Sequence, residues 1–120
     1  MTIKKIRERD VRYVRDMLDS ALTVQEFMAG MRFDEFMRDR ILQVAIERNA
    51  EIMCEVSRRI SEEFKQAYPE IPWSRIISEG KVIADEYDDV KQERMWLVAT
   101  ILVPFLIPQL EAALPPPPKE

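Results

Sequence analysis

Apolar residues recur every three or four positions along most of this chain, the spacing that places them on one face of an α-helix. The first such stripe predicts a helix from about Arg9 to Ala29, followed by Gly30 at the position where a glycine often ends a helix. The second stripe predicts one long helix from about Phe33 to Ala67, because no glycine or proline interrupts it.

Prolines divide the second half of the chain. Residues 68–72 break the long helix, since proline cannot continue the backbone hydrogen-bond ladder. A third helix is expected from Pro72 to about Tyr87, then a turn at residues 88–89, then a fourth helix from near Lys91 to Leu114. Pro104 is expected to kink or split that last helix.

Together these elements predict an all-α fold, an antiparallel bundle of four to five helices joined by short connections. The chain has only two glycines, whereas a β-rich fold of 120 residues would usually need more of them in its turns. We expect one helical domain over residues 1–114. Residues 115–120 are expected to form a disordered proline-rich tail.

Composition limits the chemistry. The chain has no histidine, which excludes any reaction that needs an imidazole. Its one cysteine, Cys54, allows no internal disulfide and is interpreted as a small buried hydrophobe, so we expect no metal site and no cofactor. The net charge of −4 argues against a protein whose main role is to bind the nucleic-acid backbone. It does not exclude a local basic groove.

The most apolar segment of the chain is expected to meet a partner. Residues 95–107 are uncharged, but they are fewer than the about 20 needed to span a bilayer and include Pro104. We therefore expect no membrane contact and, without an apolar signal segment near the start, a cytoplasmic protein. Within that stretch, residues 95–103 are apolar on all sides, and a 120-residue bundle has little room to surround such a helix. This predicts a homodimer or higher oligomer.

One polar strip interrupts the long second helix. Arg48, Glu51, Glu55 and Arg59 fall on one side of a helical wheel. A solvated face with ion pairs explains the strip as well as a functional cleft does. Asn49 lies within the apolar stripe, where it is either a satisfied core amide that fixes helix register or the edge of a polar cleft.

Several short runs, in order and without gaps, resemble one known family: residues 9–13 (RDVRY), 33–36 (FDEF), 48–52 (RNAEI), 69–73 (PEIPW) and 109–114 (QLEAAL). The chain resembles HepT, the HEPN-domain toxin encoded beside a minimal nucleotidyltransferase antitoxin. That resemblance implies a dimeric helical bundle and a metal-independent ribonuclease. Its motif of Arg, four residues, His, any residue and Tyr faces a second copy across the dimer cleft.

In this family the arginine binds the scissile phosphate, the histidine moves protons for attack by the ribose 2′-hydroxyl, and the antitoxin can transfer AMP to the tyrosine. Counted from Trp73, the motif tyrosine is Tyr87. The histidine position holds Asp85, and the arginine position holds Gly80, followed by Lys81. Aspartate cannot donate a proton at neutral pH as imidazolium does, and losing general acid–base catalysis costs about 10²–10⁴-fold in rate. Lys81 and Asp85 are expected to form an i,i+4 ion pair.

The leading hypothesis is a HepT-like HEPN protein of toxin–antitoxin type with a degenerate motif. It would act by binding itself and a nucleotidyltransferase, with RNA disfavoured as a partner. An alternative is an active endoribonuclease that uses other residues. Its candidate polar set is Arg48, Glu51, Glu55, Lys81 and Tyr87. A third hypothesis is a structural helical module without a nucleic-acid role. Whether the protein is an enzyme stays open at this stage.

Overall fold

The computed structural model describes residues 2–116, and these are helical without any strand. The order is α1 (Ile3–Met28), α2 (Phe33–Phe36), α3 (Arg40–Arg59), α4 (Glu62–Ala67), α5 (Trp73–Asp85), α6 (Asp88–Leu97), the π-helical segment η1 (Val98–Leu102) and α7 (Val103–Ala113). The predicted all-α bundle is confirmed. Residues 117–120 of the predicted tail lie outside the described range.

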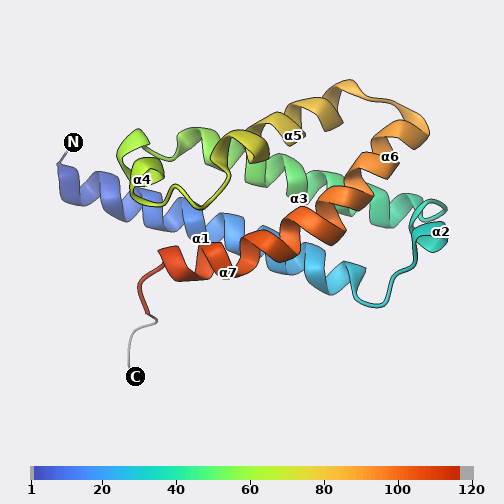
Figure 1. The fold of residues 1–120 in the computed structure, drawn as a ribbon, viewed down its shortest axis with the longest axis horizontal. Helices are drawn as coiled ribbons and strands as arrows, with labels where there is room; N and C mark the ends of the chain where they lie inside the picture. The colour runs from blue at the N-terminus through green and yellow to red at the C-terminus, as the bar shows by residue number, and fades with distance from the viewer. Residues whose placement is uncertain (1, 117–120) are drawn as a thin grey trace.

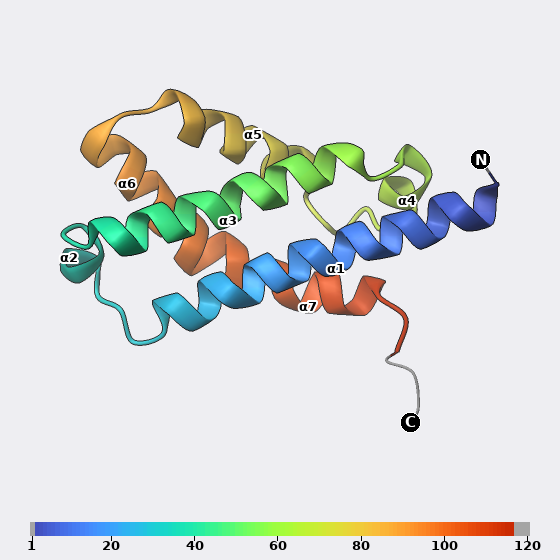
Figure 2. The ribbon, with the colours of Figure 1, turned by 180° about the vertical axis from the view of Figure 1, so that it is seen from behind.

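Two long helices form one layer of the molecule, and the remaining long helices form the other. Seen from behind in Figure 2, α1 and α3 run side by side along the long axis of the molecule. In Figure 1, α5 lies beside α3, and the continuous rod of α6, η1 and α7 crosses in front of α1. The core therefore lies between the layers, where Met17, Ile46, Leu106 and Leu110 are almost completely buried.

The first helix starts earlier than predicted and ends where predicted. It begins at Ile3, six residues before Arg9, because the Thr2 hydroxyl accepts a hydrogen bond from the backbone N–H of Lys5 and so caps the helix. Gly30 follows the helix with a φ of 70°, a left-handed conformation that favours glycine.

The prediction of one helix from Phe33 to Ala67 is wrong, because two side-chain caps divide it. The Asp39 carboxylate accepts a hydrogen bond from the Leu42 N–H and starts α3. The Ser61 hydroxyl accepts one from the Phe64 N–H and starts α4. Aspartate and serine favour such caps over helix interiors, and the continuous apolar stripe concealed that signal.

A buried carboxylate on α1 holds the start of α4 in place. Asp10 is only 2% exposed, and its two oxygens accept hydrogen bonds from the Ser61 N–H at 2.9 Å and the Ser61 hydroxyl at 2.6 Å. Hydrogen bonds to a charged acceptor offset part of the cost of burying it. This contact ties the chain entering α5 to the first helix.

The third helix is shorter than predicted, and the expected turn after it is helical. Pro72 is the N-terminal cap of α5 instead of its first residue, and α5 ends at Asp85, two residues before Tyr87. The prediction of a turn at Asp88 and Asp89 is wrong, because these two residues begin α6. Aspartate in a first helical turn is favoured by the helix dipole.

Pro104 neither breaks nor sharply ends the last helix, because the preceding turn is wider than an α-helical one. In η1 the backbone N–H of Val103 donates to the carbonyl of Val98, five residues earlier. The hydroxyl of Thr100 donates to the carbonyl of Trp96 at 2.7 Å. The π-helical turn accommodates the missing N–H of proline, and helix continues to Ala113.

The resulting helical rod is longer than the uncharged stretch of the sequence. Residues 89–113 form 25 helical residues with a peak mean hydropathy of 1.6, long and apolar enough to cross a membrane by length and composition alone. However, 44% of that apolar window is buried within the bundle, as in the core helix of a globular protein. Met95 and Leu102 are buried, whereas Leu97 and Ile101 on the other side are more than half exposed.

Candidate functional site

Gly80, at the position that corresponds to the motif arginine, faces α3. It lies between Ile76 and Ile83, which are 4% and 2% exposed, on the buried side of α5. A Cβ atom built on Gly80 would overlap the Cβ and Sγ atoms of Cys54 on α3. The Cys54 thiol donates to the carbonyl of Ile77 at 3.4 Å, which holds the sulfur at this contact. No side chain fits at position 80 while Cys54 stays where it is.

Asp85 and Lys81 face away from this contact. Asp85 is five positions after Gly80, about 140° around the helix, and both Asp85 and Lys81 are exposed. The predicted Lys81–Asp85 pair is wrong, because no ion pair joins these two among the described side chains. Within one chain, Gly80 and Asp85 therefore lie on different sides of α5.

Tyr87 lies after the end of α5, in the short connection to α6, where its backbone is extended. Its side chain is 81% exposed. The connection lies at the end of the bundle where α5 meets α6 in Figure 1. Exposed Asp85 and Asp89 flank the tyrosine in sequence, so its phenol stands in an acidic stretch open to solvent.

The polar strip on α3 borders a shallow hollow of about 410 Å³. Arg48 pairs with Glu51 at 3.5 Å, and Glu55 pairs with Arg59 at 3.0 Å and Arg58 at 3.9 Å. The hollow is lined by Arg48, Glu51, Ile52, Cys54, Glu55 and Val56. Three of the candidate residues thus come together beside the cysteine that contacts Gly80, but each arginine is already matched by a carboxylate.

Asn49 is satisfied within its own helix. Its side-chain amide donates to the carbonyl of Ala45 at 2.9 Å, and the residue is partly buried. It does not line the α3 hollow. The amide therefore has no visible role in a cleft. In the part of the chain that the structure describes, no three His, Cys, Asp or Glu side chains gather as metal ligands do.

Two ion pairs that sequence reasoning missed fix α6 against its neighbours. Lys91 of α6 pairs with Glu47 of α3, with both side chains about one-fifth exposed. Arg94 of α6 pairs with Glu79 of α5 at 3.1 Å. Partly buried pairs are screened less than exposed ones, so these two help to set the position of the connection that carries Tyr87.

The Gly80–Cys54 contact was also missed. A glycine in the interior of a predicted helix costs about 0.5–1 kcal/mol relative to alanine, which is a signal of close helix packing. Its partner on another helix cannot be read from one sequence, because two helices can meet in many registers.

The fold and these positions define a class: a small all-α helical bundle with a polar strip on α3 and the predicted motif positions on α5 and in the connection that follows it. A family model described as "Ribonuclease HepT-like" matches residues 17–113. The chain belongs to the HepT-like ribonuclease family.

Three curated relatives agree with this assignment. "Putative RNase MJ1380" of Methanocaldococcus jannaschii is 28% identical over 105 residues, which cover 87% of this chain and 96% of that protein. "Probable ribonuclease HepT" of Thermococcus cleftensis is 29% identical and covers 78% and 86% of the two chains. "Putative RNase TTE0752" of Caldanaerobacter subterraneus is 29% identical and covers 85% and 91%. No solved structure gives a significant match.

The Gly80 contact predicts an unusual response to alanine. In an open helix, Gly80→Ala would stabilise the protein by about 0.5–1 kcal/mol. Here the added methyl group overlaps Cys54, so we expect a loss of about 1–3 kcal/mol in the free energy of unfolding, measured by urea denaturation.

A double-mutant cycle isolates the overlap. Cys54→Gly removes both overlapping atoms, so Gly80→Ala should cost much less in that background, giving a coupling free energy of about 1–3 kcal/mol. Ser78→Ala, at an exposed position on the same helix, is the control and should be additive with Cys54→Gly. Additivity at Gly80 as well would contradict the contact.

Proposed function

We propose that this protein is a HepT-like member of a toxin–antitoxin type system that has lost ribonuclease activity and acts by binding partners. The observation that carries the proposal is the contact of Gly80 with Cys54, which fills the place where a motif arginine would begin. Asp85 supports it, because a carboxylate facing a phosphodiester repels the substrate and cannot replace an imidazolium acid.

The alternative of an active ribonuclease with other residues receives little support from the α3 hollow. Its only cation, Arg48, is paired with Glu51, and Glu55 adds a second carboxylate to the same lining. Two carboxylates beside one arginine that is already paired disfavour the binding of a phosphate in this hollow. Lys81 and Tyr87 are not in the lining of this hollow.

We therefore expect no RNA cleavage above background by the parent protein. Restoring the motif needs three changes, since Gly80→Arg requires the space that Cys54→Gly provides, and Asp85→His supplies the acid–base group. We expect the triple variant to cleave structured or unstructured RNA in the presence of EDTA at a rate at least about 100-fold above the parent. Gel analysis of end-labelled RNA measures both.

The variant Cys54→Gly/Gly80→Arg with Asp85 retained is the matched control and should stay inactive, because it lacks the acid–base group. Thermal unfolding of each variant shows whether it is folded. Efficient cleavage by the parent, unchanged by the triple substitution, would refute the loss of activity.

The proposal includes self-association through one face of the helical rod. Val90, Leu97, Ile101 and Phe105 lie along α6, η1 and α7 at helical spacing, and each is between 50% and 58% exposed. A row of large apolar side chains on one solvent-facing side is typical of a surface that a second protein covers. A second copy of this chain is the occupant that the family resemblance favours. A cytoplasmic location is part of the same proposal.

Ile101→Glu should weaken the dimer at least about tenfold in Kd, since it places a charge at the centre of that row. Analytical ultracentrifugation over a micromolar concentration series measures this. The control is Ile3→Glu, because Ile3 is also exposed (76%, against 57% for Ile101) and lies at the start of α1, outside the row. A monomeric parent, or an equal effect of both substitutions, would contradict the proposed interface.

A nucleotidyltransferase is the second partner in the proposal, with Tyr87 as the acceptor of an adenylyl group. The 81% exposure of its side chain lets an enzyme reach the phenol. The neighbouring Asp85 and Asp89 repel both the nucleotide and the transferred phosphate, so we expect slow modification. Intact-mass spectrometry after incubation with a minimal nucleotidyltransferase from a HepT-type pair, ATP and magnesium checks this. Rapid, complete adenylylation that Tyr87→Phe abolishes would show that the acidic neighbours do not matter.

A further inference from the structure

The first half of α1 carries an unusual concentration of positive charge. Between positions 4 and 15 there are six cations and two carboxylates, in a chain whose net charge is −4. We call these six residues the basic face: Lys4, Lys5, Arg7, Arg9, Arg12 and Arg15.

The basic face is not neutralised within the molecule. Every ion pair among the described side chains lies on other residues. Asp10, one of the two carboxylates in this segment, is buried and hydrogen-bonded to Ser61. The Nε of Arg9 is buried and has no hydrogen-bond partner. These charges are therefore available to something outside the chain.

The position of the cations along the helix is also unfavourable for the protein alone. Lys4 and Lys5 stand in the first turn of α1, where no acidic residue is present. A helix N-terminus carries the positive end of the helix dipole, so cations there lower helix stability. Residues that oppose a local folding preference are often retained for function. The dipole adds to the positive field that an external anion would meet.

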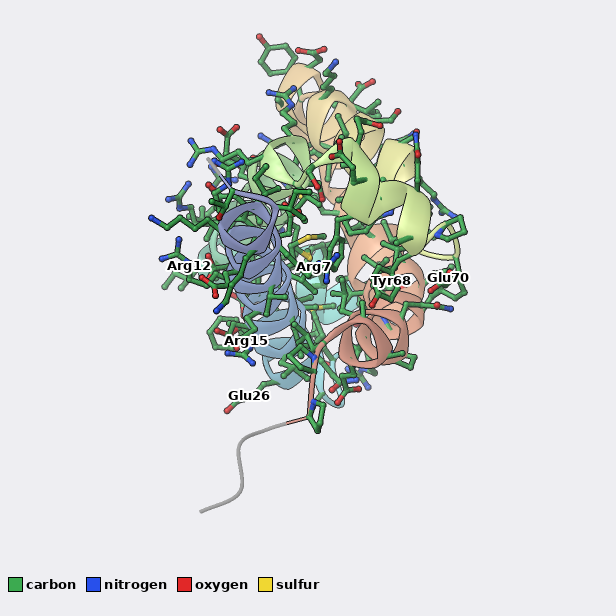
Figure 3. All side chains as sticks on the ribbon, turned by 90° about the vertical axis from the view of Figure 1, so that its left-hand side faces the viewer. Arg7, Arg12, Arg15, Glu26, Tyr68 and Glu70 are labelled. Carbon is green, nitrogen blue, oxygen red and sulfur yellow. The ribbon has the colours of Figure 1, made fainter. Side chains whose placement is uncertain are left out.

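The surface is also hollowed along this segment. All six cations line a depression of about 820 Å³, together with Glu8, Val11 and Pro115. Figure 3 looks along α1 from its N-terminal end and shows Arg12 and Arg15 extending from the helix away from the bundle. The spacing from Lys4 to Arg15 is about 16 Å along the helix, enough to meet several successive phosphates.

The molecule separates its charges along its length. The segment where α5 meets α6 holds five carboxylates, Asp85, Glu86, Asp88, Asp89 and Glu93. Figure 1 shows that this junction and the start of α1 lie at opposite ends of the molecule. A polyanion is thus attracted to α1 and repelled from the motif segment.

We propose that the basic face binds the phosphate backbone of a nucleic acid, remote from the motif segment. Four of its six cations are arginines, whose planar guanidinium donates two parallel hydrogen bonds to a phosphate. A helix that lies on a membrane would need large apolar residues beside its cations, and Val11 and Pro115 are the apolar residues in the lining of this hollow. The binding needs no cleavage and no residue of α5, so it is independent of the proposed function.

The test measures binding of a fluorescein-labelled single-stranded RNA to the full chain by fluorescence anisotropy. Arg12→Glu/Arg15→Glu should weaken binding at least tenfold and lower the slope of log Kd against log salt, since each lost phosphate contact removes about 0.7 from that slope. Both side chains are exposed, so the substitutions leave the core intact.

Arg40→Glu/Arg75→Glu is the matched control, because both arginines are exposed, lie outside the basic face and form no ion pair among the described side chains. It changes the charge equally and should alter Kd less than twofold. An equal loss of RNA affinity in both double variants would show that the basic face is not the binding site. Absence of RNA binding by the parent protein would overturn the proposal.

Two further probes separate the other anionic partners. An affinity for polyglutamate equal to that for RNA would indicate an acidic protein partner. Stronger binding to phosphatidylserine vesicles than to RNA would indicate a membrane. Either result would overturn the proposal. RNA cleavage during the titration would contradict the proposed function while leaving the binding site standing.

Discussion

The contact between α5 and α3 at Gly80 and Cys54 is the constraint on which the arrangement of the second half of the chain depends. Because no side chain separates the two helices there, Ile76 and Ile83 reach the core on either side of the glycine. That fixes the rotation of α5 about its axis. Asp85 must then face solvent, and Tyr87 follows in an extended connection at the end of the bundle. The absence of a side chain at position 80 thus lets α5 and α3 close together at a point where any larger residue would need room.

Polar contacts in this protein fall into two groups with different consequences. The hydrogen bonds between Asp10 and Ser61 and the ion pair between Lys91 and Glu47 lie at buried or half-buried positions and join separate helices. The pairs along the α3 strip are exposed and lie within one helix, where each is worth only a few tenths of a kcal/mol. The interior pairs therefore determine architecture, and the surface pairs mainly determine which charges remain free to meet other molecules.

Much of the fold follows from apolar spacing, and the errors arise where single hydrogen bonds or the packing of one helix on another decide the outcome. The stripe along the first helix and the role of Gly30 were correct because both are local properties. The merged helix from Phe33 to Ala67 was wrong because caps at Asp39 and Ser61 act through single hydrogen bonds that a stripe does not reveal. The motif positions could be numbered from Trp73, but the orientation of Gly80 toward Cys54 depends on how two helices meet, which periodicity within each one does not specify.

The π-helical turn at η1 has a consequence for how this chain tolerates change in length. A π turn holds one more residue than the α turn it replaces. The segment Val98–Leu102 therefore accommodates one extra residue without interrupting the helix. Deleting one residue there would restore an α-helical turn and leave α7 with nearly the same rotation relative to α6, because the wider turn is what absorbs the extra residue. Leu106 and Leu110, which are now fully buried, would keep facing the core. A deletion elsewhere in this rod would rotate every residue after it by about 100°, so η1 is the place where the rod best tolerates the loss of one residue.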